Sequence, residues 1–185
     1  MQELRNEEYY TYSDYCTWGD DERWELIDGI PYAMPPSLSR KHQSILGELH
    51  VQFYNFLRGK PGEVYLAPFD VRLNADSYDD TVVQPDLVIV CDKSKLDDKG
   101  CIGAPDMVIE ILSPSTFAHD KVLKFNKYLQ YGVREYWIVE PESKIVSVNV
   151  LHDGTYVVSA YAEADDIPVR VLAGCSIALS EVFHE

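Results

Sequence analysis

The sequence has little positive charge and no long apolar segment. Its 185 residues include 31 Asp and Glu but only 16 Lys and Arg, giving a formal net charge of −15. Such an acidic chain is a poor passive coat for nucleic acid, because phosphate binding depends on basic surface. A nuclease is not excluded, since a bound metal ion supplies positive charge locally. No apolar run approaches the roughly 20 residues that a membrane-spanning helix needs, so no membrane partner is predicted.

Targeting and cysteine-ligand signals are also absent. The N-terminus lacks the basic start and apolar core of a secretory signal. The four cysteines lie far apart, with neither a CxxC pair nor a Cys/His cluster. Free thiols in a reducing cytoplasm are therefore expected, rather than a zinc site or a disulfide framework. Length and a hydrophobic content of 46% predict one domain over residues 1–185, with a flexible segment at residues 1–10.

Apolar periodicity and turn signals predict a β-rich chain with two main helices. Asp28-Gly29 between two apolar runs is typical of a hairpin turn. The clustered acids between elements are expected to lie in solvated loops. The fold class is therefore α/β (α+β), with a central mixed β-sheet flanked by helices, an N-terminal hairpin and extra C-terminal strands. Strands are predicted at 24–27, 30–34, 63–66, 69–73, 82–90, 104–112, 134–139, 145–151, 155–162 and 168–172; helices at 11–18, 39–58, after 116 to Gly132, and as a turn at 180–184.

The stretch from Val82 to Gly132 carries the most informative pattern. Two apolar segments, rich in Val and Ile, are each interrupted by an acid, Asp86 in the first and Glu110 in the second. Such segments are typical of strands buried on both faces. An unpaired carboxylate at Glu110 would cost several kcal/mol there. Glu110 must therefore be protonated, paired with a cation or bound to a metal.

Asp86 and Glu110 lie 24 residues apart, on strands that the intervening chain can bring side by side. Two carboxylates and the carbonyl oxygen of Ile111 form a ligand set suited to Mg²⁺ or Mn²⁺. Lys124 follows on the next helix, where its ammonium could hold a metal-bound water or stabilise developing charge. This set predicts a minimal site for phosphodiester hydrolysis. The alternative is a buried Glu110–Lys124 ion pair, with Asp86 capping a loop.

The same residues resemble the PD-(D/E)xK phosphodiesterase superfamily, which has the restriction-endonuclease-like fold. The chain is most similar to its Uma-type family of bacterial restriction endonucleases, over roughly residues 11–150. The block Glu-Ile-Leu-Ser-Pro-Ser-Thr is the most specific part. The matching segments are Trp24 to Gly29, Pro36-Ser37 with His42, Gln84 to Leu87, Pro105 to Thr116, Asp120 with Lys124, and Gly132 to Val139.

This resemblance implies that Asp86 and Glu110 are metal ligands and that Lys124 is the catalytic lysine. The superfamily places its lysine two residues after the second acid, but Leu112 stands there. The Uma-type family supplies the lysine from the following helix, where Lys124 matches. His42 and Glu25 also lie in the segments that match the family. His42 either contacts a phosphate or assists proton transfer near neutral pH, or is a buried histidine bonded to a carbonyl.

Glu25, between Trp24 and Leu26 on a strand, faces either solvent or the site. The predicted function is that of a cytoplasmic, Mg²⁺- or Mn²⁺-dependent DNA endonuclease. A homodimer is expected, because two sites must address two antiparallel strands. A binding or regulatory module that keeps the fold without catalysis is the main alternative, and the charge of −15 favours it. A Ser or Cys hydrolase ranks lower, because no Gly-x-Ser-x-Gly elbow or Cys/His pairing is present.

Overall fold

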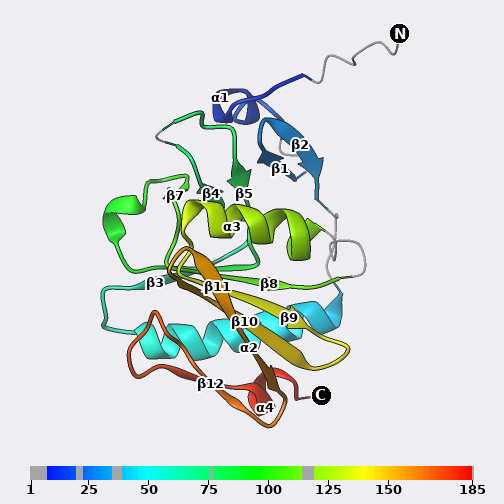
Figure 1. Cartoon of the computed structure of the whole chain (residues 1–185), viewed down its shortest axis with the longest axis vertical. Coiled ribbons are helices and arrows are strands. Elements are labelled where there is room, and N and C mark those ends of the chain that lie inside the picture. Colours follow the sequence, from blue (N-terminus) through cyan, green and yellow to red (C-terminus); the bar gives the residue numbers. More distant parts are fainter. Residues whose placement is uncertain (1–7, 20–22, 35–38, 76, 114–118, 185) are drawn as a thin grey trace.

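A computed structural model describes residues 8–19, 23–34, 39–75, 77–113 and 119–184 (Figure 1). Most of the predicted flexible N-terminal segment, the family text at Pro36-Ser37 and the segment from Pro114 to Thr116 with its helix-cap candidates lie outside these ranges. Among the described residues, no helix combines the length and the apolar character needed to cross a bilayer.

The six-stranded sheet is the centre of the fold and is mixed, as predicted. Its order is β11-β10-β9-β8-β6-β3, with β8 and β9 parallel and every other neighbouring pair antiparallel. The middle strands β6 and β8 are buried along their whole length, which confirms the prediction from their Val- and Ile-rich sequences. Its strands are β3 (Glu63–Leu66), β6 (Leu87–Val90), β8 (Met107–Ile111), β9 (Glu135–Glu140), β10 (Ile145–His152) and β11 (Thr155–Ala162).

A second sheet of five strands has the order β2-β1-β5-β4-β7. Its β1–β2 pair is the predicted hairpin, and Asp28 and Gly29 both take positive φ at the turn. The C-terminal strands β12 (Asp166–Pro168) and β13 (Ser176–Ala178) form a separate two-stranded sheet. The five strands are β1 (Trp24–Ile27), β2 (Ile30–Ala33), β4 (Asp70–Arg72), β5 (Val82–Val83) and β7 (Gly100–Ile102).

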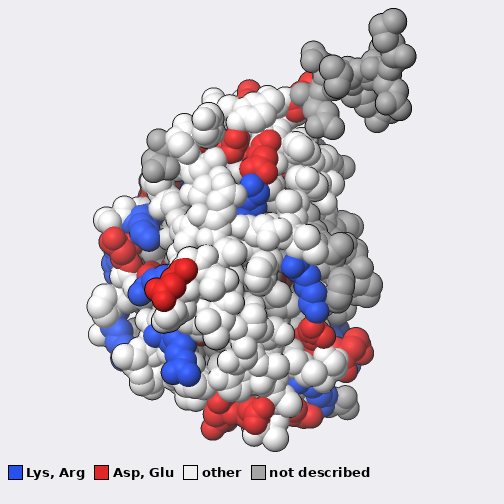
Figure 2. Space-filling model, viewed as in Figure 1, with Lys and Arg blue, Asp and Glu red and all other residues white. Residues whose placement is uncertain are grey.

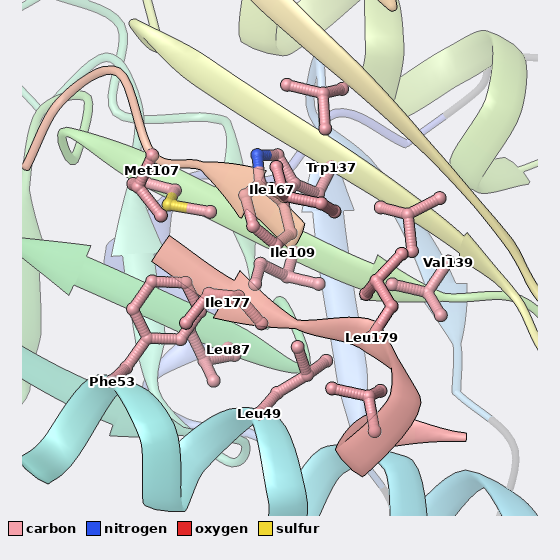
Figure 3. Packing of buried hydrophobic residues seen from close by; sticks show 14 of the residues in the cluster. Leu49, Phe53, Leu87, Met107, Ile109, Trp137, Val139, Ile167, Ile177 and Leu179 are labelled. Atoms are coloured by element: carbon pink, nitrogen blue, oxygen red, sulfur yellow. The ribbon is translucent and has the colours of Figure 1, made fainter. Parts of the chain in front are cut away.

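Two helices lie on opposite faces of the six-stranded sheet (Figure 1). Helix α2 (Arg40–Leu57) places Leu49 and Phe53 against Met107 and Ile109 of β8, together with the C-terminal strands (Figure 3). Helix α3 (Phe125–Tyr131) covers the other face, where Tyr128 packs in a second core. Short helices are α1 (Tyr12–Tyr15), the 3-10 turn η1 (Lys93–Lys95) and α4 (Leu179–Val182).

Strand alternation decides which side chains face α3. On β8, Met107 and Ile109 belong to the α2-side core, whereas Val108 belongs to the α3-side core. Because successive side chains of a strand point to opposite faces, Glu110 shares the α3 face with Val108. On β6, Leu87 and Ile89 lie on the α2 side and Val88 on the α3 side. Alternation along the strands therefore places the side chains of Glu110 on β8 and Val88 on β6 on the face of the sheet that α3 covers.

Several predicted elements differ from those observed. The strand expected at residues 168–172 is not formed, because β12 ends at Pro168 and the next strand, β13, begins only at Ser176. The strand expected over residues 82–90 is two strands, β5 in one sheet and β6 in the other, because Pro85 has no N–H to donate to a ladder. The helix that precedes Gly132 begins as a π-helix, η2 (His119–Lys124), and becomes α-helical only at Phe125.

The π-helical start affects how the lysines of this helix are placed. A π-turn has a wider hydrogen-bonding interval than an α-turn, so a spacing of three residues does not keep Lys121 and Lys124 in line. Lys121 pairs with Glu140 and Lys127 pairs with Asp28, whereas Lys124 pairs with Glu110 in the acidic cluster described below.

The clustered acids that were expected to lie in solvated loops include one exception, Asp80. Asp80 is buried, and its Oδ1 accepts hydrogen bonds from Asn74 Nδ2 at 2.6 Å and Thr81 Oγ1 at 3.0 Å. Burial alone would raise the pKa of Asp80. Hydrogen bonds from Tyr9, Asn74 and Thr81 together outweigh that effect, so the pKa lies below its ordinary value. Asp80 therefore stabilises the loop through buried hydrogen bonds and is not exposed to solvent.

Candidate active site

Asp86 and Glu110 meet at the end of the β6–β8 ladder. Leu87 pairs with Ile109 in this antiparallel ladder, so Asp86 and Glu110 flank that pair on adjacent strands. The backbone N–H of Ile111 donates to Asp86 Oδ2 over 2.8 Å, which fixes the carboxylate against β8. The sequence-based expectation that the two acids lie side by side is confirmed.

Lys124 joins this pair from the last turn of η2. Its Nζ lies 2.8 Å from Glu110 Oε1 and 2.7 Å from Glu25 Oε1. The side chains of all three residues are buried, at 2% to 4% exposure. The Glu110–Lys124 ion pair of the alternative interpretation is thus present, and a second carboxylate, that of Glu25, contacts the same ammonium.

Glu25 faces the site, which settles the question of its orientation left open by the sequence. Strand β1 carries it inward, and Glu25 Oε1 accepts the backbone N–H of Gln84 over 2.8 Å as well as the ammonium of Lys124. Gln84 lies in the segment that links β5 to β6 and precedes Pro85-Asp86. Glu25 therefore ties the catalytic lysine candidate to the chain segment that presents Asp86.

Tyr128 is a member of the cluster that sequence reasoning missed. Its hydroxyl donates to Glu110 Oε1 over 2.8 Å, and the whole side chain is buried. Burial raises the pKa of Tyr128 well above its ordinary value, and the negative charge of Glu110 raises it further. The hydroxyl therefore stays protonated and serves as a donor. Its spacing of four residues from Lys124 is a signal that could have identified it, because such residues share a helix face.

His42 approaches Asp86 from the other side of the sheet edge. It lies in the first turn of α2, where Ser39 caps the helix by accepting the N–H of His42. His42 Nε2 lies 3.1 Å from Asp86 Oδ2, and the ring is buried. The partner is thus a carboxylate rather than a carbonyl. An ionised carboxylate can only accept, so Nε2 carries the proton in this pair, and Nδ1 has no hydrogen-bond partner among the described residues.

Counted over the described residues, the cluster carries more negative than positive charge. Glu25 and Glu110 both pair with the ammonium of Lys124, and Asp86 lies beside Glu110 on the adjacent strand. Bringing several carboxylates together in a buried setting costs free energy, because like charges repel and lose water. A divalent cation is the counter-charge that this arrangement matches in sign and size.

The donor set fits a hard cation that keeps part of its water shell. Among the residues that the structure describes, no three His, Cys, Asp or Glu side chains form a ready-made ligand cluster. Mg²⁺ is usually held by one or two carboxylates and completes its coordination with water. Within the described ranges, Asp86 Oδ1 accepts no hydrogen bond, because both contacts of this carboxylate involve Oδ2. Asp86, Glu110 and the Ile111 carbonyl are thus suited to hold Mg²⁺ or Mn²⁺ with several waters.

Comparisons with known proteins agree with this architecture. A crystal structure described as a putative nuclease belonging to DUF820, from Anabaena variabilis, superposes with a TM-score of 0.76 and covers 94% of this chain and 97% of that one, at 18% identity. This likeness shows the restriction-endonuclease-like fold that the sequence predicted. An uncharacterized protein of Synechocystis sp. is 28% identical over 178 residues, covering 92% of this chain and 90% of the relative.

The family comparison covers nearly the whole sequence. The family model for Uma2, described as "Putative restriction endonuclease", matches residues 7–180. This range contains the three sheets described above, helices α2 and α3, and every residue of the acidic cluster. It also extends beyond residue 150, where the sequence-based resemblance ended. The chain belongs to the Uma2 family.

Proposed function

We propose that the protein is a metal-dependent DNA endonuclease that hydrolyses phosphodiester bonds at the cluster of Asp86, Glu110 and Lys124. The observation that carries the proposal is a buried lysine paired with the carboxylates of Glu25 and Glu110, with Asp86 next to Glu110 on the adjacent strand where β6 and β8 end. Family membership supports it, since the family is described as restriction endonucleases. The similar structure from Anabaena variabilis, itself described as a nuclease, supports it as well.

Asp86, Glu110 and the Ile111 carbonyl would hold Mg²⁺ or Mn²⁺. A cation there supplies Lewis acidity toward a phosphoryl oxygen and lowers the pKa of bound water. Lys124 contributes one positive charge next to the reacting phosphate, where it stabilises the charge that develops on the oxygens. Glu25 and Tyr128 are positioning residues, because they hold Lys124 and Glu110 in place.

His42 has a positioning role in the same proposal. Its contact with Asp86 Oδ2 orients that carboxylate, as an outer partner orients a metal ligand. Its Nδ1 is buried without a hydrogen-bond partner among the described residues.

Plasmid cleavage tests the proposal directly. The wild type should convert supercoiled DNA to nicked and linear forms with Mg²⁺ or Mn²⁺ and should not do so in EDTA. Asp86→Ala and Lys124→Ala should lose this activity. Lys127→Ala is the matched control, because Lys127 lies on the same helix but pairs with Asp28 outside the cluster. Equal cutting by all four proteins would assign the activity to a contaminant and overturn the proposal.

A catalytically inactive binding or regulatory module is the second candidate. The charge of −15 favours it, as does the pairing of Lys124 with two carboxylates at once. Figure 2 shows that Lys and Arg residues on the described part of this face are scattered among neutral residues and do not form a continuous basic surface. Such a module would bind its partner without cutting DNA in either metal, so the plasmid assay separates the two candidates.

The proposed enzyme acts in the cytoplasm as a two-fold homodimer. A duplex has two antiparallel strands, and a pair of sites related by two-fold symmetry can address both. Sedimentation velocity in the presence of a duplex oligonucleotide checks this point. A dimer is expected, whereas a monomer that cuts both strands would contradict the two-fold arrangement.

A further inference from the structure

An aromatic pocket lies beside the candidate active site, between α1 and the five-stranded sheet. It has a volume of about 490 Å³, within the range of small-ligand sites. Aromatic rings line it in a connected series, in which Tyr15 and Trp18 have ring centroids 5.4 Å apart and Trp18 and Trp24 5.9 Å apart. Trp18 and Trp24 are only half-buried, which leaves apolar ring surface open in an otherwise acidic protein.

Polar groups line the same pocket at defined positions. Asp70 Oδ1 accepts from the Tyr15 hydroxyl over 3.0 Å and from Gln84 Nε2 over 2.9 Å. Arg23 donates from Nε and Nη2 to Gln84 Oε1 over 3.0 Å and 2.7 Å. Within the described part of the chain, Asp70 Oδ2 and Arg23 Nη1 make no hydrogen bond, so the pocket offers one acceptor and one donor to a ligand.

Gln84 connects this pocket to the acidic cluster. Its side chain bonds to Asp70, Tyr15 and Arg23 in the pocket, whereas its backbone N–H donates to Glu25 Oε1 over 2.8 Å. Glu25 in turn holds Lys124. Gln84 also lies two residues before Asp86 in the chain. A ligand held in the pocket is therefore adjacent to the proposed reaction centre.

We propose that this pocket binds a nucleobase of a single-stranded or unpaired segment of the substrate. Aromatic rings stack on the face of any base. The Watson–Crick edge of each base carries both donors and acceptors, which groups such as Asp70 and Arg23 can bind. A base inside a duplex is stacked on its neighbours and cannot enter the pocket without unpairing. The inference rests on the proposed nuclease function and adds that its DNA substrate presents an unpaired base beside the cleavage site.

Fluorescence anisotropy with a labelled single-stranded oligonucleotide tests the pocket independently of catalysis. The full-length protein is titrated in EDTA, so that no hydrolysis accompanies binding, and the same oligonucleotide as a duplex is measured in parallel. Trp18→Ala should weaken single-strand binding about 10-fold and change duplex binding little, because it removes a stacking surface. Trp18→Phe, which keeps a ring, should restore most of the affinity. Tyr54→Ala is the control, since Tyr54 is exposed on α2 away from the pocket.

Asp70→Asn distinguishes base recognition from attraction to phosphate. If the pocket only attracts the backbone, removal of a negative charge should strengthen binding. If Asp70 accepts from a base edge, replacing its free oxygen by an amide N–H should weaken binding several-fold. Circular dichroism and thermal melting of each variant confirm that it is folded.

The outcomes separate this inference from the proposed function. Unchanged single-strand binding by Trp18→Ala, or absence of single-strand binding by the wild type, overturns the pocket, whatever the plasmid assay shows. If single-strand binding depends on Trp18 but the protein cuts no substrate with Mg²⁺ or Mn²⁺, the proposal that the pocket binds a base is retained and the proposed nuclease function is overturned.

Discussion

Glu110 of β8 and Glu135 of β9 are both buried glutamates on neighbouring parallel strands, but they face opposite sides of the six-stranded sheet. On the α2 side, Glu135 accepts from two neutral donors, Trp137 Nε1 at 2.8 Å and the Val171 N–H at 2.9 Å. On the α3 side, Glu110 meets the charged Lys124 and lies next to Asp86. Glu135 therefore binds the backbone of the C-terminal segment at Val171, whereas Glu110 belongs to a cluster of charged side chains.

The two arrangements differ in what they require. Burial is the largest influence on Glu135 and raises its pKa, although the hydrogen bonds of Trp137, Val171 and Arg170 and the charge of Arg170 oppose that rise. The cluster around Glu110 instead brings two carboxylates to one ammonium, with the carboxylate of Asp86 beside them on the adjacent strand. We therefore expect a buried carboxylate to belong to an active site where other charged groups contact it, as at Glu110. Variants of Glu110 and Glu135 should then differ in cleavage rate and in unfolding free energy.

The largest expected difference is in catalysis. Glu110→Gln should lower the rate of plasmid cleavage by about 100-fold or more, because it removes a proposed metal ligand. Glu135→Gln should leave the rate within about twofold, since Glu135 lies on the other face. Cleavage time courses at saturating Mg²⁺ compare the two variants. Equal losses would mean that both act through stability alone.

Removal of Lys124 should give the largest change in stability. Lys124→Met leaves Glu25 and Glu110 without their shared ammonium, and loss of one partner of a buried pair costs about 3–5 kcal/mol. Urea denaturation at neutral pH measures the change. The double variant Glu110→Gln with Lys124→Met should recover part of the loss, because it removes a stranded charge. No recovery would argue against electrostatic coupling of these residues.

Tyr128→Phe should have a smaller effect on the same cluster. It deletes the hydroxyl that donates to Glu110 Oε1 and keeps the ring that packs in the α3-side core. The expected loss is about 1–2 kcal/mol of unfolding free energy, the usual cost of one buried hydrogen bond to a charged group. Urea denaturation against the wild type checks it, and a neutral substitution would show that Glu110 obtains the donor elsewhere.

The smallest effect concerns the pH dependence contributed by Glu135. Its folded-state pKa is raised, mainly by burial, so the folded protein holds this proton more tightly than the unfolded chain. The resulting stabilisation is present at pH below the unfolded pKa and is lost as pH rises through the folded pKa. Compared with Glu135→Gln, the wild type should therefore lose stability between acidic and neutral pH. A constant difference across that range would contradict the raised pKa.

Much of the fold and part of the site follow from sequence period alone. Val- and Ile-rich segments specify buried strands, and alternation along β8 places Glu110 on the same face as Val108. Helix spacing brings Lys124 and Tyr128 to one face. These relations are local, so they can be obtained without knowing the partner elements.

The remaining features depend on contacts between distant elements. The break at Pro85 could be anticipated, but the transfer of the chain to a second sheet depends on how β5 pairs with β1 and β4. The hydrogen bond to Glu25 comes from the backbone N–H of Gln84, and a backbone donor cannot be identified from the type of residue. The π-helical start of the helix that carries Lys124 also had no signal in the residue spacing.

Isothermal titration calorimetry with Mn²⁺ tests most directly whether the carboxylates at the ends of β6 and β8 mark a cation site. The wild type should bind Mn²⁺, and Glu110→Gln and Asp86→Asn should each weaken that binding by about 10-fold or more, while Glu135→Gln binds as the wild type does. Absence of Mn²⁺ binding by the wild type, or equal binding by all four proteins, would contradict the assignment of these two carboxylates to a metal.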